Sequence, residues 1–103
     1  MNITFQSIHF AADQKLKAYI SQKLEKLKKF NDQILDCKVI MKLENNGQVK
    51  DKIVEILVKI PGETFISIED SKTFESSCDK AVVSLKRQIK RHKVKLISKK
   101  RSG

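Results

Sequence analysis

The feature that most constrains this chain is the way its apolar residues change period along the sequence. In two long stretches they recur at spacings of three and four residues, and elsewhere they alternate with polar residues. The first pattern is typical of a helix with one apolar stripe, and the second of a strand with one buried face. The order of these stretches therefore predicts the order of helices and strands.

The alternating stretches predict four strands, at residues 3–10, 34–43, 54–60 and 64–68. A slip of register at Ser7 suits a bulge in the first strand. Residues 45–47, with the sequence Asn-Asn-Gly, tolerate positive φ and predict a hairpin turn, and Pro61-Gly62 breaks the next run. The last three strands are therefore expected to form an antiparallel meander.

The stretches with helical spacing predict two amphipathic helices, of about five and about six turns. The apolar stripe of the first consists of Leu16, Tyr19, Ile20, Leu24, Leu27 and Phe30. The stripe of the second consists of Phe74, Cys78, Ala81, Val82, Leu85, Ile89, His92 and Leu96. Asp13 is the expected N-cap of the first helix, and Asp70 or Ser71 that of the second.

The resulting order is β-α-β-β-β-α, which predicts an α+β fold. One four-stranded sheet with both helices packed on one face satisfies this order and leaves the other face to solvent. A chain of 103 residues suits one domain. We expect residues 1–97 to form that domain and residues 98–103 to form a frayed, disordered basic tail.

Charge is distributed very unevenly along the chain. The net charge is +10, and residues 80–103 hold 10 of the 22 basic residues and none of the 12 acidic ones. The remaining residues are balanced, so the whole net charge belongs to the last quarter of the sequence. Such a basic segment favours a polyanionic partner, either nucleic acid or an anionic membrane.

The second predicted helix carries most of these cations away from its apolar stripe. Lys80, Arg87 and Arg91 fall together on one side, and Lys86, Lys90 and Lys93 widen the basic surface. A merely solvated face would intersperse acids at a spacing of four residues, and none occurs here. The lysines of the first helix lie on both flanks and suit solubility as well as anion binding, with Lys23 at the edge of the stripe.

Several other classes of function find no support in the residues. Cys37 and Cys78 lack metal-ligand spacing and are expected to be apolar core residues in a reducing compartment. His9, in the first predicted strand, and His92, on the inner or boundary side of the second helix, have no catalytic partner at motif spacing. Nucleotide-binding and paired-carboxylate motifs are absent. We therefore expect no enzyme, cofactor or metal site.

The aromatic residues bear on how RNA would be held. Most of them occupy predicted core positions, which leaves no evident platform for stacking bases. Contacts should then go mainly to phosphate, with specificity from the shape of a folded RNA. The sequence also has no apolar run of the 18 residues or more that spanning a membrane requires, and no signal-like start, so we expect a cytosolic protein.

Four segments carry a resemblance to a known family: residues 2–4 (Asn-Ile-Thr), residues 24–30, Pro61-Gly62 and the basic run at residues 85–96. Together they resemble the ribosome hibernation promoting factors, including protein Y. The likeness covers nearly all of the chain, and the run at 85–96 is its most specific part. Ser84 stands where the family often has lysine.

This resemblance implies a domain similar in outline to double-stranded RNA-binding domains. It also implies binding to the small ribosomal subunit and its RNA, where the domain blocks the channel for messenger and transfer RNA and inhibits translation in stationary phase or stress. The chain looks like the short form, without the second domain of longer members, and a monomer off the ribosome. The expected RNA-binding residues are Lys23, Lys26, Lys29, Lys80, Lys86, Arg87, Lys90, Arg91, Lys93 and Lys95.

Two alternatives stay open at this point. A general double-stranded RNA-binding module or RNA chaperone would show the same basic helix, and sedimentation with ribosomal subunits separates it from a hibernation factor. A small nuclease would need a general acid and base beside the scissile phosphate, and incubation with labelled RNA would reveal it.

Overall fold

The computed structural model describes the backbone of residues 1–46 and 49–102, and the side chains of residues 1–44 and 51–93. Its elements are β1 (Asn2–Ile8), α1 (Gln14–Glu25), the 3-10 helix η1 (Lys26–Lys29), β2 (Asp36–Asn46), β3 (Val49–Ile60), β4 (Glu63–Ser71) and α2 (Phe74–Ser102). The predicted order β-α-β-β-β-α is confirmed. The first predicted helix divides into α1 and the tighter turn η1.

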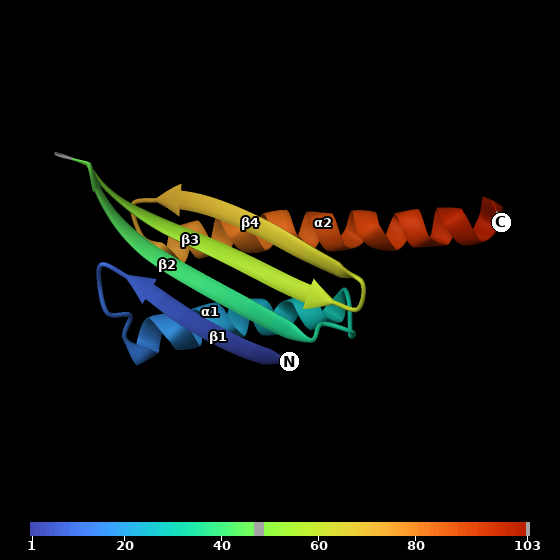
Figure 1. The fold of residues 1–103 in the computed structure, drawn as a ribbon, viewed down its shortest axis with the longest axis horizontal. Coiled ribbons are helices and arrows are strands. Elements are labelled where there is room, and N and C mark those ends of the chain that lie inside the picture. Colours follow the sequence, from blue (N-terminus) through green and yellow to red (C-terminus); the bar gives the residue numbers. More distant parts are fainter. Residues whose placement is uncertain (47–48, 103) are drawn as a thin grey trace.

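The four strands form one mixed sheet in the order β1-β2-β3-β4 (Figure 1). β1 runs parallel to β2, whereas β2, β3 and β4 form the predicted antiparallel meander. A parallel pair requires a crossover, and α1 with η1 provides it. The register aligns the apolar positions, with Val39 opposite Ile56 and Val58 opposite Phe65.

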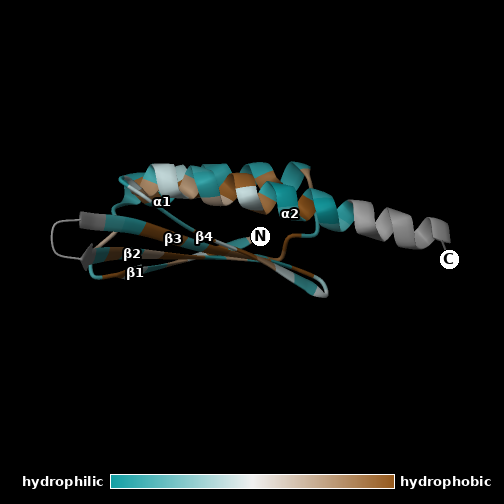
Figure 2. Cartoon of the chain, turned by 90° about the horizontal axis from the view of Figure 1, so that it is seen from above, coloured by the Kyte–Doolittle hydropathy of each residue, from teal (hydrophilic) through white to brown (hydrophobic). Residues whose placement is uncertain are grey.

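Both helices cover the same face of the sheet, as predicted (Figure 2). The core lies between the two layers, where inward strand residues meet the helical stripes. Its fully buried members are Ile20, Leu24, Leu27, Cys37, Val39, Met41, Val54, Ile56, Val58, Cys78, Ala81, Leu85 and Ile89. Burial of one such aliphatic side chain contributes about 1.5 to 3 kcal/mol. Cys37 and Cys78 are among these buried residues, so their predicted place in the core is confirmed.

The first strand ends earlier than its pattern predicts. β1 pairs with β2 without interruption up to Ile8, so the bulge predicted at Ser7 is wrong. Ser7 occupies an ordinary inward position that is only partly buried, which explains the apparent slip. His9 lies outside the strand at a φ of 68°, and Phe10 stacks on Phe74 with ring centroids 4.4 Å apart. The contact with the Phe74 ring, and not a place in the sheet, therefore accounts for an apolar residue at position 10.

The caps of the two helices differ in how well the sequence predicts them. The Asp13 carboxylate accepts a hydrogen bond from the Leu16 N–H at 2.8 Å and caps α1, as predicted. For α2 the prediction of Asp70 or Ser71 is wrong, because both belong to β4. The hydroxyl of Thr73 accepts a hydrogen bond from the Ser76 N–H at 3.0 Å and caps this helix.

Two predictions fall at the margins of the described residues. β2 continues through Asn46, which pairs with Val49, so Asn45 and Asn46 belong to a strand and not to the turn. Gly47 lies outside the described residues. The backbone of α2 runs to Ser102, but the side chains of 94–103 are outside the description, and the frayed tail at 98–103 stays a prediction. Within the described part, no helix is long and apolar enough to cross a membrane.

Candidate nucleic-acid interface

The orientation of α2 on the sheet is fixed by its packing and by two side chains. The helix lies over β3 and β4 and beside α1. The Gln88 amide donates a hydrogen bond to the Ile66 carbonyl of β4 at 2.9 Å, and the Lys80 ammonium donates one to the Asp70 carbonyl at 3.3 Å. Because Leu85 and Ile89 face the core, Arg87 between them is held toward solvent.

The solvent side of α2 carries exposed cations. Lys80, Arg87, Lys90, Arg91 and Lys93 are exposed, and Lys86 is partly buried. Neither Arg87 nor Arg91 forms an ion pair with any residue that the structure describes. Their charges are therefore available to an external anion.

Near its N-terminal end, α2 carries an acidic residue, Asp79, that contacts two residues of α1. Asp79 accepts a hydrogen bond from the Tyr19 hydroxyl at 2.8 Å and lies 3.7 Å from the Lys23 ammonium. The hydrogen bond to Asp79 raises the pKa of Tyr19 to about 12. Lys23 also lies 5.4 Å from the centre of the Tyr19 ring. Lys23 thus joins α1 to α2, and its charge is partly compensated within the protein.

The same end of α2 has a shallow depression of mixed charge. It is lined by Lys80, Val83 and Arg87 together with the carboxylate residues Glu69 and Asp79. Beyond it, residues 80–93 contain no acid, so the uncompensated positive surface lies mainly over residues 86–93. We call this surface, formed by Lys86, Arg87, Lys90, Arg91 and Lys93, the basic face.

One aromatic ring at the edge of the basic face contacts two of its lysines. The ammonium groups of Lys86 and Lys90 lie 4.7 Å and 5.1 Å from the centre of the Phe30 ring. The sequence placed Phe30 in the core, but it is only partly buried at the end of η1. Phe30 is the last apolar residue of its stripe. That terminal position is the one feature of the sequence that could have indicated a side chain at the edge of the core.

A hollow of about 630 Å³ lies beside Phe30, and we call it the Phe30 hollow. It is lined by residues 28–33, by Ile60 at the end of β3 with Pro61 and Gly62 of the turn that follows, and by His92 and Lys93 of α2. Sequence reasoning did not identify it, because it is formed by three segments that the fold brings together. Lys29 belongs to its lining. Lys26 is exposed on η1 but does not line it, and the side chain of Lys95 lies outside the described residues.

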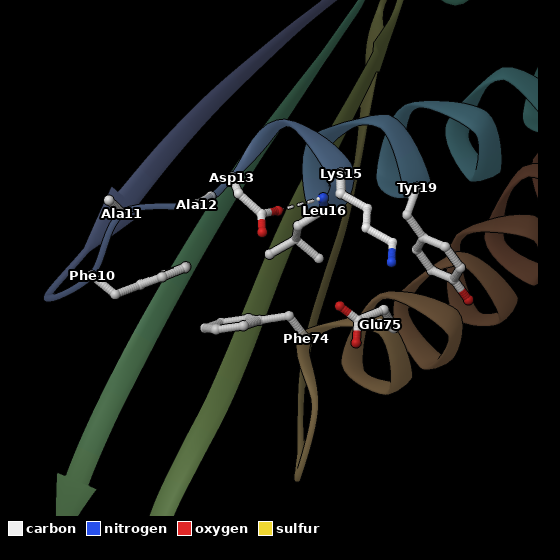
Figure 3. A pocket seen from close by; sticks show the side chains of 9 residues that line it. All are labelled: Phe10, Ala11, Ala12, Asp13, Lys15, Leu16, Tyr19, Phe74 and Glu75. Atoms are coloured by element: carbon white, nitrogen blue, oxygen red, sulfur yellow. Dashed lines mark hydrogen bonds between the residues drawn. The ribbon is translucent and has the colours of Figure 1, made fainter.

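A second hollow, of about 510 Å³, lies at the other end of the helices (Figure 3). Its walls include the Phe10–Phe74 stack and Tyr19, and it carries one cation, Lys15, and one carboxylate, Glu75, besides the cap Asp13. One lysine faces two carboxylates, so this hollow has no preference for an anion.

The cysteines and histidines do not form a chemical centre. Burial raises the pKa of the Cys37 thiol to about 11 and that of Cys78 to about 12, so both thiols stay protonated at neutral pH. His92 packs edge-on against Phe65, with ring centroids 5.5 Å apart, and its Nδ1 lies 4.0 Å from a Glu63 carboxylate oxygen. Among the described residues, no group of three or more His, Cys, Asp or Glu side chains is placed to hold a metal ion.

Comparison with known proteins identifies relatives along nearly the whole chain. Residues 3–97 match the family described as Sigma 54 modulation protein / S30EA ribosomal protein. The ribosome hibernation promoting factor of Pseudomonas putida is 30% identical over 95 residues, covering 92% of this chain and 89% of that protein. The ribosome hibernation promotion factor of Deinococcus radiodurans is 26% identical over 90 residues, and the match spans 47% of its length.

Two solved structures share the fold. The N-terminal domain of Thermus thermophilus Protein Y superposes with a TM-score of 0.80 at 28% identity, covering 89% of this chain and 99% of that domain. A ribosomal subunit interface protein of Coxiella burnetii gives 0.82 at 22% identity, covering 91% and 99%. The predicted fold and resemblance are thereby confirmed, and the chain belongs to the Sigma 54 modulation protein / S30EA ribosomal protein family, which includes the ribosome hibernation promoting factors.

Proposed function

We propose that this protein is a ribosome hibernation factor that binds the small ribosomal subunit through the basic face and blocks the channel for messenger and transfer RNA. Family membership supports a ribosome-associated, non-enzymatic role in hibernation. The observation that supports the contact itself is the absence of acids from residues 80–93 of α2. Phosphate contacts from such a face position a protein on folded RNA without reading its sequence.

The residues of the proposed contact are expected to contribute unequally to binding. Arg87, Arg91 and Lys93 are exposed on the basic face, with Lys86 and Lys90 held beside Phe30. Lys26, Lys29 and Lys80 extend the contact at its margins, and Lys95 is included on its place in the sequence alone. Lys23 contributes less, because Asp79 already compensates its charge. A ribosomal partner would also place the protein in the cytoplasm, as the sequence predicts.

Charge reversal on the basic face tests this function. Arg87→Glu with Arg91→Glu should abolish both sedimentation with small subunits and inhibition of translation in a purified system. Lys38→Glu with Lys59→Glu is the matched control, since both lysines are exposed on the open face of the sheet. The control should bind like the unmodified protein. Equal losses in the two variants, with intact folding by circular dichroism, would mean that diffuse charge is responsible.

Two further measurements separate the alternatives. A bound protein that blocks the channel should prevent a labelled messenger or transfer RNA from binding the small subunit. A general double-stranded RNA binder would instead be displaced from subunits by a modest excess of duplex RNA. Unimpeded binding of both labelled RNAs beside the protein would contradict the proposed blocking mechanism.

A further inference from the structure

The Phe30 hollow has the dimensions and the composition of a small-ligand site. Its volume of about 630 Å³ lies within the range of pockets that bind small molecules. Of its lining residues, Ile60 is buried and Phe30 partly buried, whereas Lys29 and Lys93 are exposed. A ligand there would have an apolar surface inside and an anionic group at the rim.

Lys86 and Lys90 do not line the hollow but lie beside Phe30, and they indicate where the anionic group would lie. Lys86 and Lys90 are one helical turn apart, and like charges at that spacing repel each other. Both ammonium groups nevertheless lie about 5 Å from one ring centre, at 4.7 Å and 5.1 Å, where the negative face of the ring attracts cations. An anion bound between them would relieve the remaining repulsion.

The polar residues of the hollow favour a nucleotide over a simple anion. The lining holds three lysines, Lys28, Lys29 and Lys93, and one carboxylate, Asp32, which a simple anion would not use. A carboxylate can, however, accept a hydrogen bond from the N–H edge of a base, and the side-chain amide of Gln33 can pair with base edges as well. An aromatic ring, adjacent cations and such acceptors together match a base with its phosphate.

We propose that the Phe30 hollow binds one unpaired ribonucleotide of the RNA that the basic face contacts. The base stacks against Phe30, and its phosphate lies beside Lys86 and Lys90. This inference rests on the proposed function and adds a base contact to an interface otherwise made of phosphate contacts. It also revises the expectation from the sequence that no aromatic ring is available for stacking.

A titration of the full, ¹⁵N-labelled chain by NMR tests the site without the ribosome. Adenosine 5′-monophosphate should shift the backbone N–H signals of Asn31, Gly62 and His92, and should leave those of Ala12 and Glu75 at the other hollow unchanged. Ribose 5-phosphate, which carries the same anion without a base, should cause much smaller shifts. Equal shifts with both ligands, or none at millimolar concentration, would overturn the base contact.

Substitutions of Phe30 test the site on the small subunit. Phe30→Leu should weaken binding about 5- to 150-fold, the range that stacking of one base on an aromatic ring provides. Phe30→Tyr keeps the ring and should bind within about twofold of the unmodified protein. Phe10→Leu is the matched control, because Phe10 is also partly buried but lines the opposite hollow.

The outcomes distinguish this inference from the function on which it rests. If the unmodified protein does not bind small subunits, the proposed function fails whatever the nucleotide titration shows. If it binds and Phe30→Leu binds equally well, the inference alone fails. If Phe30→Leu does not fold by circular dichroism, the titration of the unmodified chain and the Phe30→Tyr variant decide the question.

Discussion

At the residue scale, the pKa of each of the two thiols reflects how deeply its side chain is buried. Cys37 and Cys78 have the ordinary spacing of core residues in a strand and a helix, and both are fully buried. Their assignment from sequence succeeds because burial of a small apolar side chain follows from periodicity alone. The raised pKa of each thiol is a consequence of that burial, because a thiolate is poorly solvated in an apolar core.

We expect the raised thiol pKa values to make the fold less stable at alkaline pH. Above the ordinary thiol pKa of 9.0, the unfolded chain loses these protons while the folded chain keeps them up to about 11 and about 12. The free energy of unfolding should therefore fall between pH 9 and pH 11, by on the order of 1 to 2 kcal/mol per thiol at pH 10.5. Urea unfolding under reducing conditions at pH 7, 9 and 10.5 measures it.

The control for the alkaline effect is Cys37→Ala with Cys78→Ala. This variant should be less stable at pH 7, because two core side chains are truncated. Its stability should change less between pH 9 and pH 10.5, with Tyr19 contributing the remaining loss through its own raised pKa. The same pH dependence in both proteins would show that the thiols are not responsible.

At the scale of elements, sequence reasoning places interiors better than ends. Every predicted helix and strand exists, because apolar periodicity is set by which face is buried. The ends depend on a few local contacts that periodicity does not encode. Phe10 continues the alternation of β1 although it packs on Phe74, and β4 continues through Asp70 and Ser71, which the sequence offered as caps. Several polar residues before α2 could serve as its N-cap by residue type, and the path of the chain places Thr73 at that position.

We predict that Thr73→Ala destabilises the protein by about 0.5 to 2 kcal/mol. The Thr73 hydroxyl accepts the Ser76 N–H at 3.0 Å, and alanine leaves that donor without its partner at the start of α2. Asp70→Ala is the control, since Asp70 is exposed and contacts Lys80 only through its carbonyl, so its cost should stay within about 0.5 kcal/mol. Chemical denaturation of both variants provides the comparison. A larger cost at Asp70 would restore the cap predicted from sequence.

At the scale of the whole molecule, the sequence predicts a basic helix but not how its charge is balanced. The segment 80–103 has no acid of its own, yet Glu69 of β4 and Asp79 lie beside Lys80 and Arg87 at one end of the face. Asp79 also draws in Lys23 from α1. These pairings come from tertiary packing, as does the Phe30 hollow, and helical periodicity within one element cannot predict them.

This balance of charge leads to a prediction about salt dependence. Each neutralised phosphate releases condensed counterions, so the logarithm of the binding constant should fall with the logarithm of salt at about −0.7 to −0.9 per contact. With five or more contacts, the slope for small-subunit binding should be steeper than roughly −3. Lys90→Gln with Arg91→Gln removes two exposed cations that lie away from Glu69 and Asp79 and should reduce the magnitude of the slope by about two. Lys23→Gln with Lys80→Gln removes the same charge from partly compensated positions and should reduce it by less than about one.

The measurement is subunit affinity at four salt concentrations for the three proteins, with circular dichroism as the check on folding. Equal reductions in the two variants would mean that Asp79 and its neighbours do not withhold Lys23 and Lys80 from RNA, and that the contact extends over the whole helical layer instead of the basic face.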